Sequence, residues 1–212
     1  MRKTHFSFLG AVALAAALAT PLVAQKSPFT EHVPTEKDPL RFSAFAVQMQ
    51  GGIAGSVEIA IERWSTDAER SALVGLVQTS TDREGGQAKL LKAVQDIKPR
   101  VGFIRTPNSM GWDLKYAYES KLPDGSRQIV IATDKPIGFG GMAASGGDTV
   151  NYPFSLIEMQ FPAGSNKGTG KLIPQTSVSV KNGRLEIVRY SDANEPVRLT
   201  EITEQKEKAK KN

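Results

Sequence analysis

Cysteine is absent from this chain and histidine is nearly absent, with no Cys and 2 His among 212 residues. The missing thiols exclude disulfides, a cysteine nucleophile, Cys-ligated zinc and iron–sulfur clusters. His5 and His32 both precede the region that we expect to fold, which argues against a Ser-His-Asp triad or His-ligated zinc in the folded body. We therefore assign no catalytic residue, no metal ligand and no cofactor from the sequence.

The chain also lacks an apolar run long enough to span a bilayer. Its one hydrophobic stretch, Phe6 to Leu18, follows the basic residues Arg2 and Lys3. A basic start, a short apolar core and a small residue at Ala24 are typical of a secretory signal peptide. We predict a signal peptide over residues 1–24, cleavage just after Ala24, export to the periplasm or the medium, and no membrane span.

The body of the chain carries little net charge, although the formal net charge of the whole chain is +5. Two of these charges belong to the leader and two more to the lysine-rich end from Glu204 to Asn212, so the body is nearly neutral. A nucleic-acid binder concentrates basic charge on its folded surface, so we predict no nucleic-acid partner. We expect a Pro-rich linker over 25–39, a single β-rich domain over 40–203 and a disordered basic tail over 204–212.

The body does contain a series of segments within which apolar and polar residues alternate. Turn residues join these segments. Tight turns are expected at Pro123 to Gly125 and at Asn182 and Gly183. About nine strands are predicted, mostly neighbours in sequence, near residues 41–49, 57–62, 101–104, 112–119, 128–133, 154–161, 171–180, 184–190 and 197–202. The fold class is therefore mainly β, an antiparallel meander that forms a barrel or a sandwich.

Helical spacing interrupts this pattern after the second strand. Thr66 and Glu69 fit a capping box, and Leu73 and Leu76 follow at helical spacing. A second apolar stripe runs from Leu90 to Ile97 and ends before Pro99. We predict two short inserted helices that cover one face or end of the sheet.

Several segments resemble an uncharacterised family of exported bacterial proteins: Arg63 to Arg70, Gly102 to Pro107 with Gly111 to Leu114, Ala132 to Phe139, Tyr152 to Glu158 and Pro196 to Thr200. The resemblance covers about Phe42 to Ile202. It implies export and a shared fold, but no reaction and no catalytic residues, because the family has no established activity. Gly140 to Gly147 departs from the polar, aromatic-containing loop expected there, so a family site on that loop would be altered here.

Two glycine-rich segments superficially match nucleotide-binding motifs. Gly138 to Ala143 fits a dinucleotide-binding pattern, but no apolar helical stripe follows it. Gly164 to Lys171 has the wrong glycine spacing for a phosphate loop, and Leu172 stands where Ser or Thr is needed. We interpret both as ordinary loops.

Two sets of residues remain as candidates for function. Glu58 and Glu62 share a strand face but lie about 13 Å apart, too far for most glycosidases unless Asp113 or Glu158 supplies a partner. The second set flanks loops at strand ends and combines aromatic, cationic and acidic side chains, as a ligand-binding mouth does: Arg105, Trp112, Asp134, Lys135 and Tyr152. The alternative is that these aromatics lie at the edge of the core and that Arg105 forms an ordinary surface ion pair.

The sequence thus favours an exported non-catalytic binding or structural domain. Its partner would be a small molecule, held inside a barrel or elsewhere, or a protein of the cell envelope. The alternative function is a carboxylate-based hydrolase acting on a glycan.

Overall fold

A computed structural model describes residues 32–48, 53–79, 83–107, 109–138, 152–181, 184–190 and 196–205. The predicted signal peptide, most of the glycine-rich segment 138–143 and the last residues of the predicted tail lie outside these ranges. The turn expected at Asn182 and Gly183 also lies outside the described residues.

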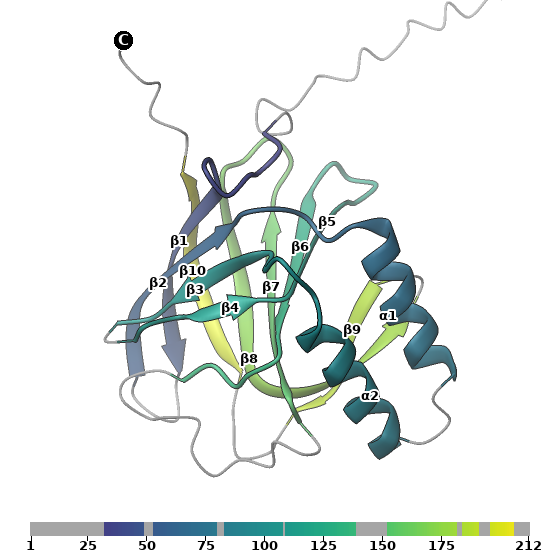
Figure 1. The fold of residues 1–212 in the computed structure, drawn as a ribbon. Coiled ribbons are helices and arrows are strands. Elements are labelled where there is room, and N and C mark those ends of the chain that lie inside the picture. The colour runs from purple at the N-terminus through teal and green to yellow at the C-terminus, as the bar shows by residue number, and fades with distance from the viewer. Residues whose placement is uncertain are drawn as a thin grey trace, which may run out of the picture.

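Antiparallel strands form one sheet that curls into a nearly closed barrel, which confirms the mainly β prediction and selects the barrel over the sandwich (Figure 1). Along the sheet the order is β4-β3-β2-β1-β10-β8-β7-β6-β5, and β9 pairs with β8 off this path. The strands are β1 (Leu40–Gln48), β2 (Ile53–Ile61), β3 (Gly102–Arg105), β4 (Trp112–Leu114), β5 (Tyr116–Lys121), β6 (Arg127–Thr133), β7 (Phe154–Phe161), β8 (Lys167–Lys181), β9 (Arg184–Tyr190) and β10 (Val197–Gln205).

The predicted strand over 112–119 is divided into β4 and β5 at Lys115. β4 pairs with β3, whereas β5 pairs with β6, and the Lys115 amide donates to the carbonyl of Ala132 on β6 at 3.0 Å. The chain changes partners at this residue, which brings the two ends of the sheet together. The segment before α1 also bonds to β5 near this junction, because the Ser65 amide donates to the Ala117 carbonyl at 2.9 Å.

The barrel interior holds the main hydrophobic core. Inward side chains from all strands of the barrel path pack together, including Ile59, Ile104, Ile131 and Leu199. The rings of Phe42 and Phe161 lie 5.6 Å apart in this core. Gly168 permits this packing, because a Cβ at that position would lie 2.9 Å from the Phe161 ring.

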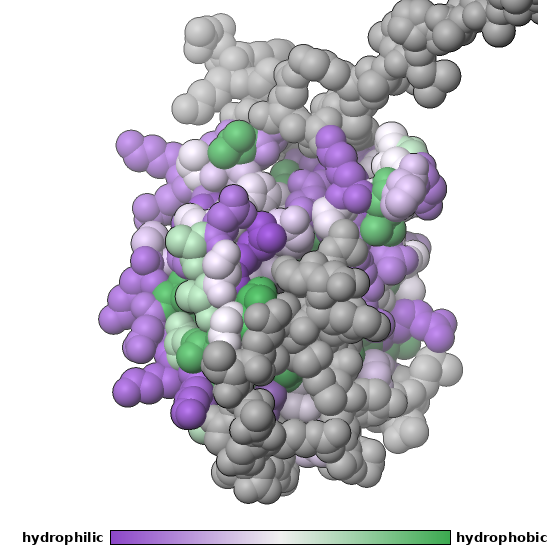
Figure 2. All heavy atoms as spheres, turned by 90° about the vertical axis from the view of Figure 1, so that its right-hand side faces the viewer, coloured by the Kyte–Doolittle hydropathy of each residue, from purple (hydrophilic) through white to green (hydrophobic). Residues whose placement is uncertain are grey.

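Helices α1 (Asp67–Thr79) and α2 (Arg83–Gln95) confirm the predicted insertion between the second and third strands. Thr66 and Glu69 form the expected capping box: the Glu69 amide donates to the Thr66 hydroxyl, and the Thr66 amide donates to the Glu69 carboxylate. The helices cover the outside of the barrel, where their apolar residues form a second core with outward residues of β5 to β8: Leu73, Leu90, Val94, Tyr116, Val130, Phe154, Leu156 and Val178. Among the residues coloured in Figure 2, which faces this side, hydrophobic ones occupy small areas between hydrophilic ones.

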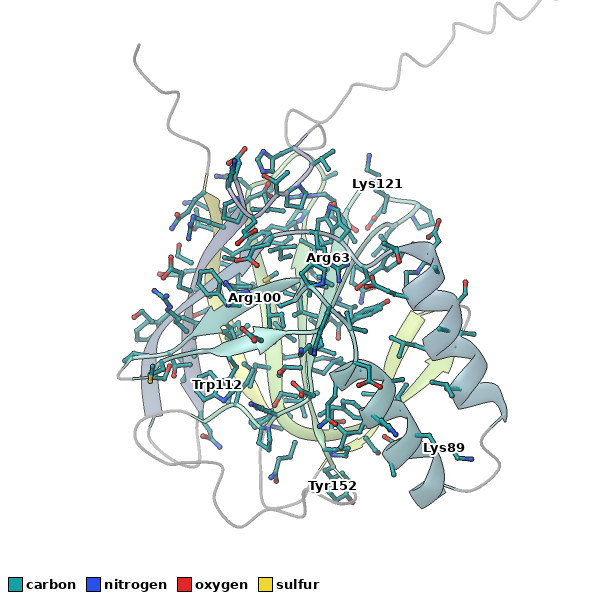
Figure 3. All side chains as sticks on the ribbon, in the orientation of Figure 1. Arg63, Lys89, Arg100, Trp112, Lys121 and Tyr152 are labelled. Atoms are coloured by element: carbon teal, nitrogen blue, oxygen red, sulfur yellow. The ribbon has the colours of Figure 1, made fainter. Side chains whose placement is uncertain are left out.

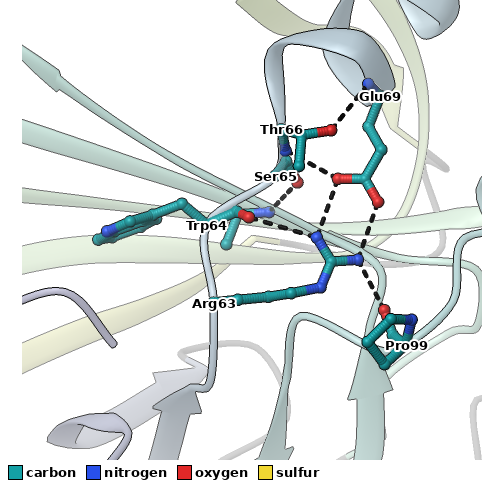
Figure 4. Close-up of polar contacts among 7 residues, drawn as sticks. Arg63, Trp64, Ser65, Thr66, Glu69 and Pro99 are labelled. Carbon is teal, nitrogen blue, oxygen red and sulfur yellow. Dashed lines mark hydrogen bonds and ion pairs between the residues drawn. The ribbon is translucent and has the colours of Figure 1, made fainter. Parts of the chain in front are cut away.

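Arg63 links the start of α1 to the barrel (Figure 4). The Arg63 guanidinium makes two bonds to the Glu69 carboxylate, at 2.9 and 2.8 Å, and donates to the carbonyl of Pro99 just before β3. These contacts hold the pKa of Glu69 below its usual value, chiefly through the bond from Arg63. The Glu69 carboxylate therefore takes part in the capping box and also holds the arginine that bonds to Pro99.

The strand β10 continues through Gln205, so Glu204 and Gln205 belong to the domain and not to the predicted tail. Two contacts with residues distant in the sequence explain this difference. The Glu204 carboxylate is buried against Arg127, and the Glu204 amide donates to the carbonyl of Asn166 at 2.8 Å.

Candidate functional site

The lower end of the barrel in Figure 1 is crossed by the segment that follows β6. The Ser155 hydroxyl on β7 accepts from the Ile137 amide at 2.9 Å and lies 2.8 Å from the Lys135 carbonyl. Three residues beyond Lys135, the Gly138 carbonyl accepts from Thr106 at the end of β3, at 3.3 Å. The segment thus reaches from one wall of the barrel to another, and the Ile137 side chain is buried in the main core.

The opposite end is filled by an ion cluster. Arg127 of β6 bonds to Glu119 of β5 at 3.1 Å and to Glu204 of β10, and its guanidinium lies over the Phe161 ring, 4.9 Å from the centroid. The side chains of Arg127 and Glu204 are only 5% and 6% exposed. Within the described part of the chain, a segment thus crosses one end of the barrel and an ion cluster lies at the other.

Two carboxylates that the sequence offered for hydrolysis do lie close together, on either side of one guanidinium. Arg100 bonds to Glu62 through two nitrogens, at 3.0 and 2.9 Å, and to Asp113 at 2.9 Å. These bonds, which Arg100 donates to Glu62 foremost and to Asp113, raise the pKa of Arg100 above its ordinary value. A glycosidase needs a carboxyl group that keeps its proton, whereas a guanidinium favours ionised carboxylates, so this cluster suits a structural ion pair.

The other candidate carboxylates are also bound by cations. Glu58 lies 3.4 Å from Arg41 on the neighbouring strand β1. Glu158 on β7 bonds to Lys171 at 2.9 Å and accepts from Gln128. Burial by itself would raise the pKa of Glu158, but the bonds from Lys171 and Gln128 outweigh it and the pKa is lowered.

The five predicted ligand-binding residues do not converge on one point. Arg105 is exposed at the end of β3, whereas Trp112 on β4 lies opposite Ile104 in the pairing and packs against the main core. Side chains alternate along a strand, so Arg105 and Trp112 point to opposite faces of the sheet. Asp134 and Lys135 belong to the crossing segment, and Lys135 is exposed. Figure 3 shows Tyr152 at the bottom of the molecule, well apart from Trp112.

Arg105 is held in place on the outer surface of the β3–β4 hairpin. Its guanidinium carbon lies 4.9 Å from the centroid of the Phe103 ring. Gly111, which has a φ of +88°, makes room for the arginine stem, because a Cβ there would lie 3.0 Å from the Arg105 Cγ. Met110, the neighbouring residue, is fully exposed. We call Phe103, Arg105 and Met110 the hairpin site.

Charge pairing distinguishes Arg105 from most of the other arginines. Arg41, Arg63, Arg70, Arg100 and Arg127 each bond to a carboxylate. Within the described part of the chain, Arg105 and Arg198 have no such bond. Arg198 was not singled out from the sequence, because it looks like an ordinary exposed residue of a strand. Its neighbours on β1 and β8 depend on how the strands are paired, which the sequence does not show.

Neither helix of the described chain has the length and apolar character needed to cross a bilayer. Among the described residues, no group of histidine and acidic side chains is arranged to hold a metal ion. Comparison with protein-family models, with curated proteins and with solved structures finds no match to this chain.

Proposed function

We propose that the protein is exported and acts as a non-catalytic binding domain that holds its ligand at the hairpin site. One observation carries the proposal: Arg105 is held on the outer surface against the Phe103 ring, without an ionic partner among the described residues. A guanidinium that is stacked on an aromatic ring still presents its N–H edge, which matches a carboxylate or phosphate group. The ligand would be an anionic small molecule or an acidic side chain of an envelope protein.

The proposal is favoured over the carboxylate hydrolase by the ion pairs of the candidate acids. Glu58, Glu62, Asp113 and Glu158 each bond to a cation. Each of these carboxylates would have to lose its bond to the cation before it could act as a proton donor. That loss would lower the stability of the fold. Binding at Arg105 requires no such rearrangement.

The test is native mass spectrometry of the protein purified from the envelope of its own cells. The wild type should carry an additional mass that is lost or reduced in Arg105→Gln. Lys121→Gln removes the same charge from the opposite end of the barrel and serves as the control (Figure 3). Equal retention of the mass in Arg105→Gln and the wild type would refute binding at this site, as would the absence of any bound species.

A further inference from the structure

A second surface, distinct from the hairpin site, lies on the outside of β1, β10 and the first half of β8. Figure 1 shows α1 and α2 on the side of the barrel away from β1 and β2, so the helices leave this face open. Its outward side chains alternate with the buried core residues along each strand: Arg41, Ser43 and Phe45 on β1, Arg198, Thr200 and Thr203 on β10, and Lys167, Thr169 and Lys171 on β8. We call this the open face.

Two cations stand directly opposite each other on the open face. In the pairing of β10 with β8, Arg198 is the partner of Lys171. Lys171 bonds to Glu158 at 2.9 Å on its other side, whereas Arg198 contacts no carboxylate among the described residues. Among the described residues, Glu158 thus offsets the charge of Lys171, whereas the charge of Arg198 is left for an anion from outside.

An exposed aromatic ring lies beside these cations. Phe45 is 44% exposed and pairs with Thr200, two residues from Arg198. The Thr200 hydroxyl donates to the Phe45 carbonyl at 3.2 Å, which fixes the two strands against each other. Thr169 on β8 is exposed and adds a hydroxyl to the same surface.

We propose that the open face binds an acidic polysaccharide. The apolar side of a sugar ring packs on Phe45, its hydroxyls bond to Thr169, and its carboxylates meet Arg198 and Lys171. A sheet face with one exposed aromatic ring among hydroxyls and cations has too little apolar area to enter a bilayer, which favours a polysaccharide over an anionic membrane. The inference rests on residues other than the hairpin site and stands whether or not Arg105 binds a ligand.

The experiment is affinity electrophoresis of the purified full chain in gels that contain polygalacturonate, hyaluronate or the neutral polymer dextran. The acidic polymers should retard the wild type and dextran should not. Arg198→Gln should weaken the retardation about tenfold, through loss of a charge-assisted contact. Phe45→Ala should weaken it severalfold, and this effect should persist at high salt, where a purely ionic contact would be screened.

Lys121→Gln is the matched control, since it removes one positive charge elsewhere on the surface. It should bind the acidic polymers like the wild type. Equal weakening by this control would mean that overall charge governs binding, which overturns the proposal. Failure of both acidic polymers to retard the wild type overturns it too, as does binding to phosphatidylglycerol vesicles that depends on Arg198 when the polymers do not bind. Because Arg105→Gln tests the hairpin site separately, failure of either proposal leaves the other measurable.

Discussion

The ion cluster at the upper end of the barrel permits a sharp prediction about stability. Replacing Arg127 by Met keeps the length of the side chain but removes the charge that Glu204 faces. The Glu204 side chain is 6% exposed, so its carboxylate would remain in the interior without a cation. Breaking a buried ion pair in this way costs about 3–5 kcal/mol of unfolding free energy. For a domain of this size the melting temperature should fall by roughly 6–20 °C.

The measurement is urea unfolding followed by tryptophan fluorescence, since Trp64 and Trp112 both pack against the main core and report its loss. The double variant Arg127→Met/Glu204→Leu removes both buried charges and should recover stability to within about 2 kcal/mol of the wild type. Glu119 is 22% exposed and can turn to water in that variant. Arg41→Met is the matched control: its partner Glu58 is 44% exposed, so the loss should stay below about 1 kcal/mol. The reasoning is refuted if Arg127→Met costs no more than this control, or if the double variant is as unstable as the single one.

Three further predictions concern the lower end of the barrel, the helix cap and the leader. Ser155→Ala leaves the buried Ile137 amide without its acceptor and should lower the unfolding free energy by about 1–3 kcal/mol in urea titrations; an unchanged midpoint would contradict this. Because the bond from Arg63 lowers the pKa of Glu69 in the folded state from the ordinary 4.5, Glu69 stabilises the fold fully above that pH and loses the effect as pH falls through the folded value. Glu69→Gln should therefore show a smaller loss of melting temperature than the wild type on acidification from neutral pH, and parallel pH profiles would argue against it. Export predicts that N-terminal sequencing of protein from the envelope begins at Gln25, and an intact Met1 would count against cleavage there.

The local elements of the fold were open to prediction because their signals are local. The capping box at Thr66 and Glu69 satisfies helix amides within one turn, so a short stretch of sequence is enough to predict the start of α1. Strand alternation likewise predicted that residues 57–61 of β2 form a strand. The break at Lys115 was not predicted, because the alternation from Trp112 to Glu119 continues through it. Only the change of partner from β3 to β6 bends the chain there.

The candidate sites were less predictable, because they depend on which residues face the same side. Arg105 and Trp112 are both close to a hairpin turn, but the pairing of Ile104 with Trp112 sends their side chains to opposite faces. An irregularity lies further along β10, where Glu201 has a φ of 51° and the register with β8 shifts between Leu199 and Ile202. This shift places Leu199 and Ile202 both in the core, although strict alternation would separate them.

The sequence by itself determined the antiparallel β class, the position of the two helices and the lack of thiol chemistry, since composition, periodicity and capping need no distant partner. Closure of the barrel, the contacts across its two ends and the ionic partners of the described charged side chains were decided only by the tertiary structure. The physical reason is that these features join residues far apart in the chain, such as Arg127 with Glu204 and Thr106 with Gly138. The same long-range pairing leaves Arg105 and Arg198 without carboxylate partners in the described part of the chain, and both proposed binding surfaces rest on that result.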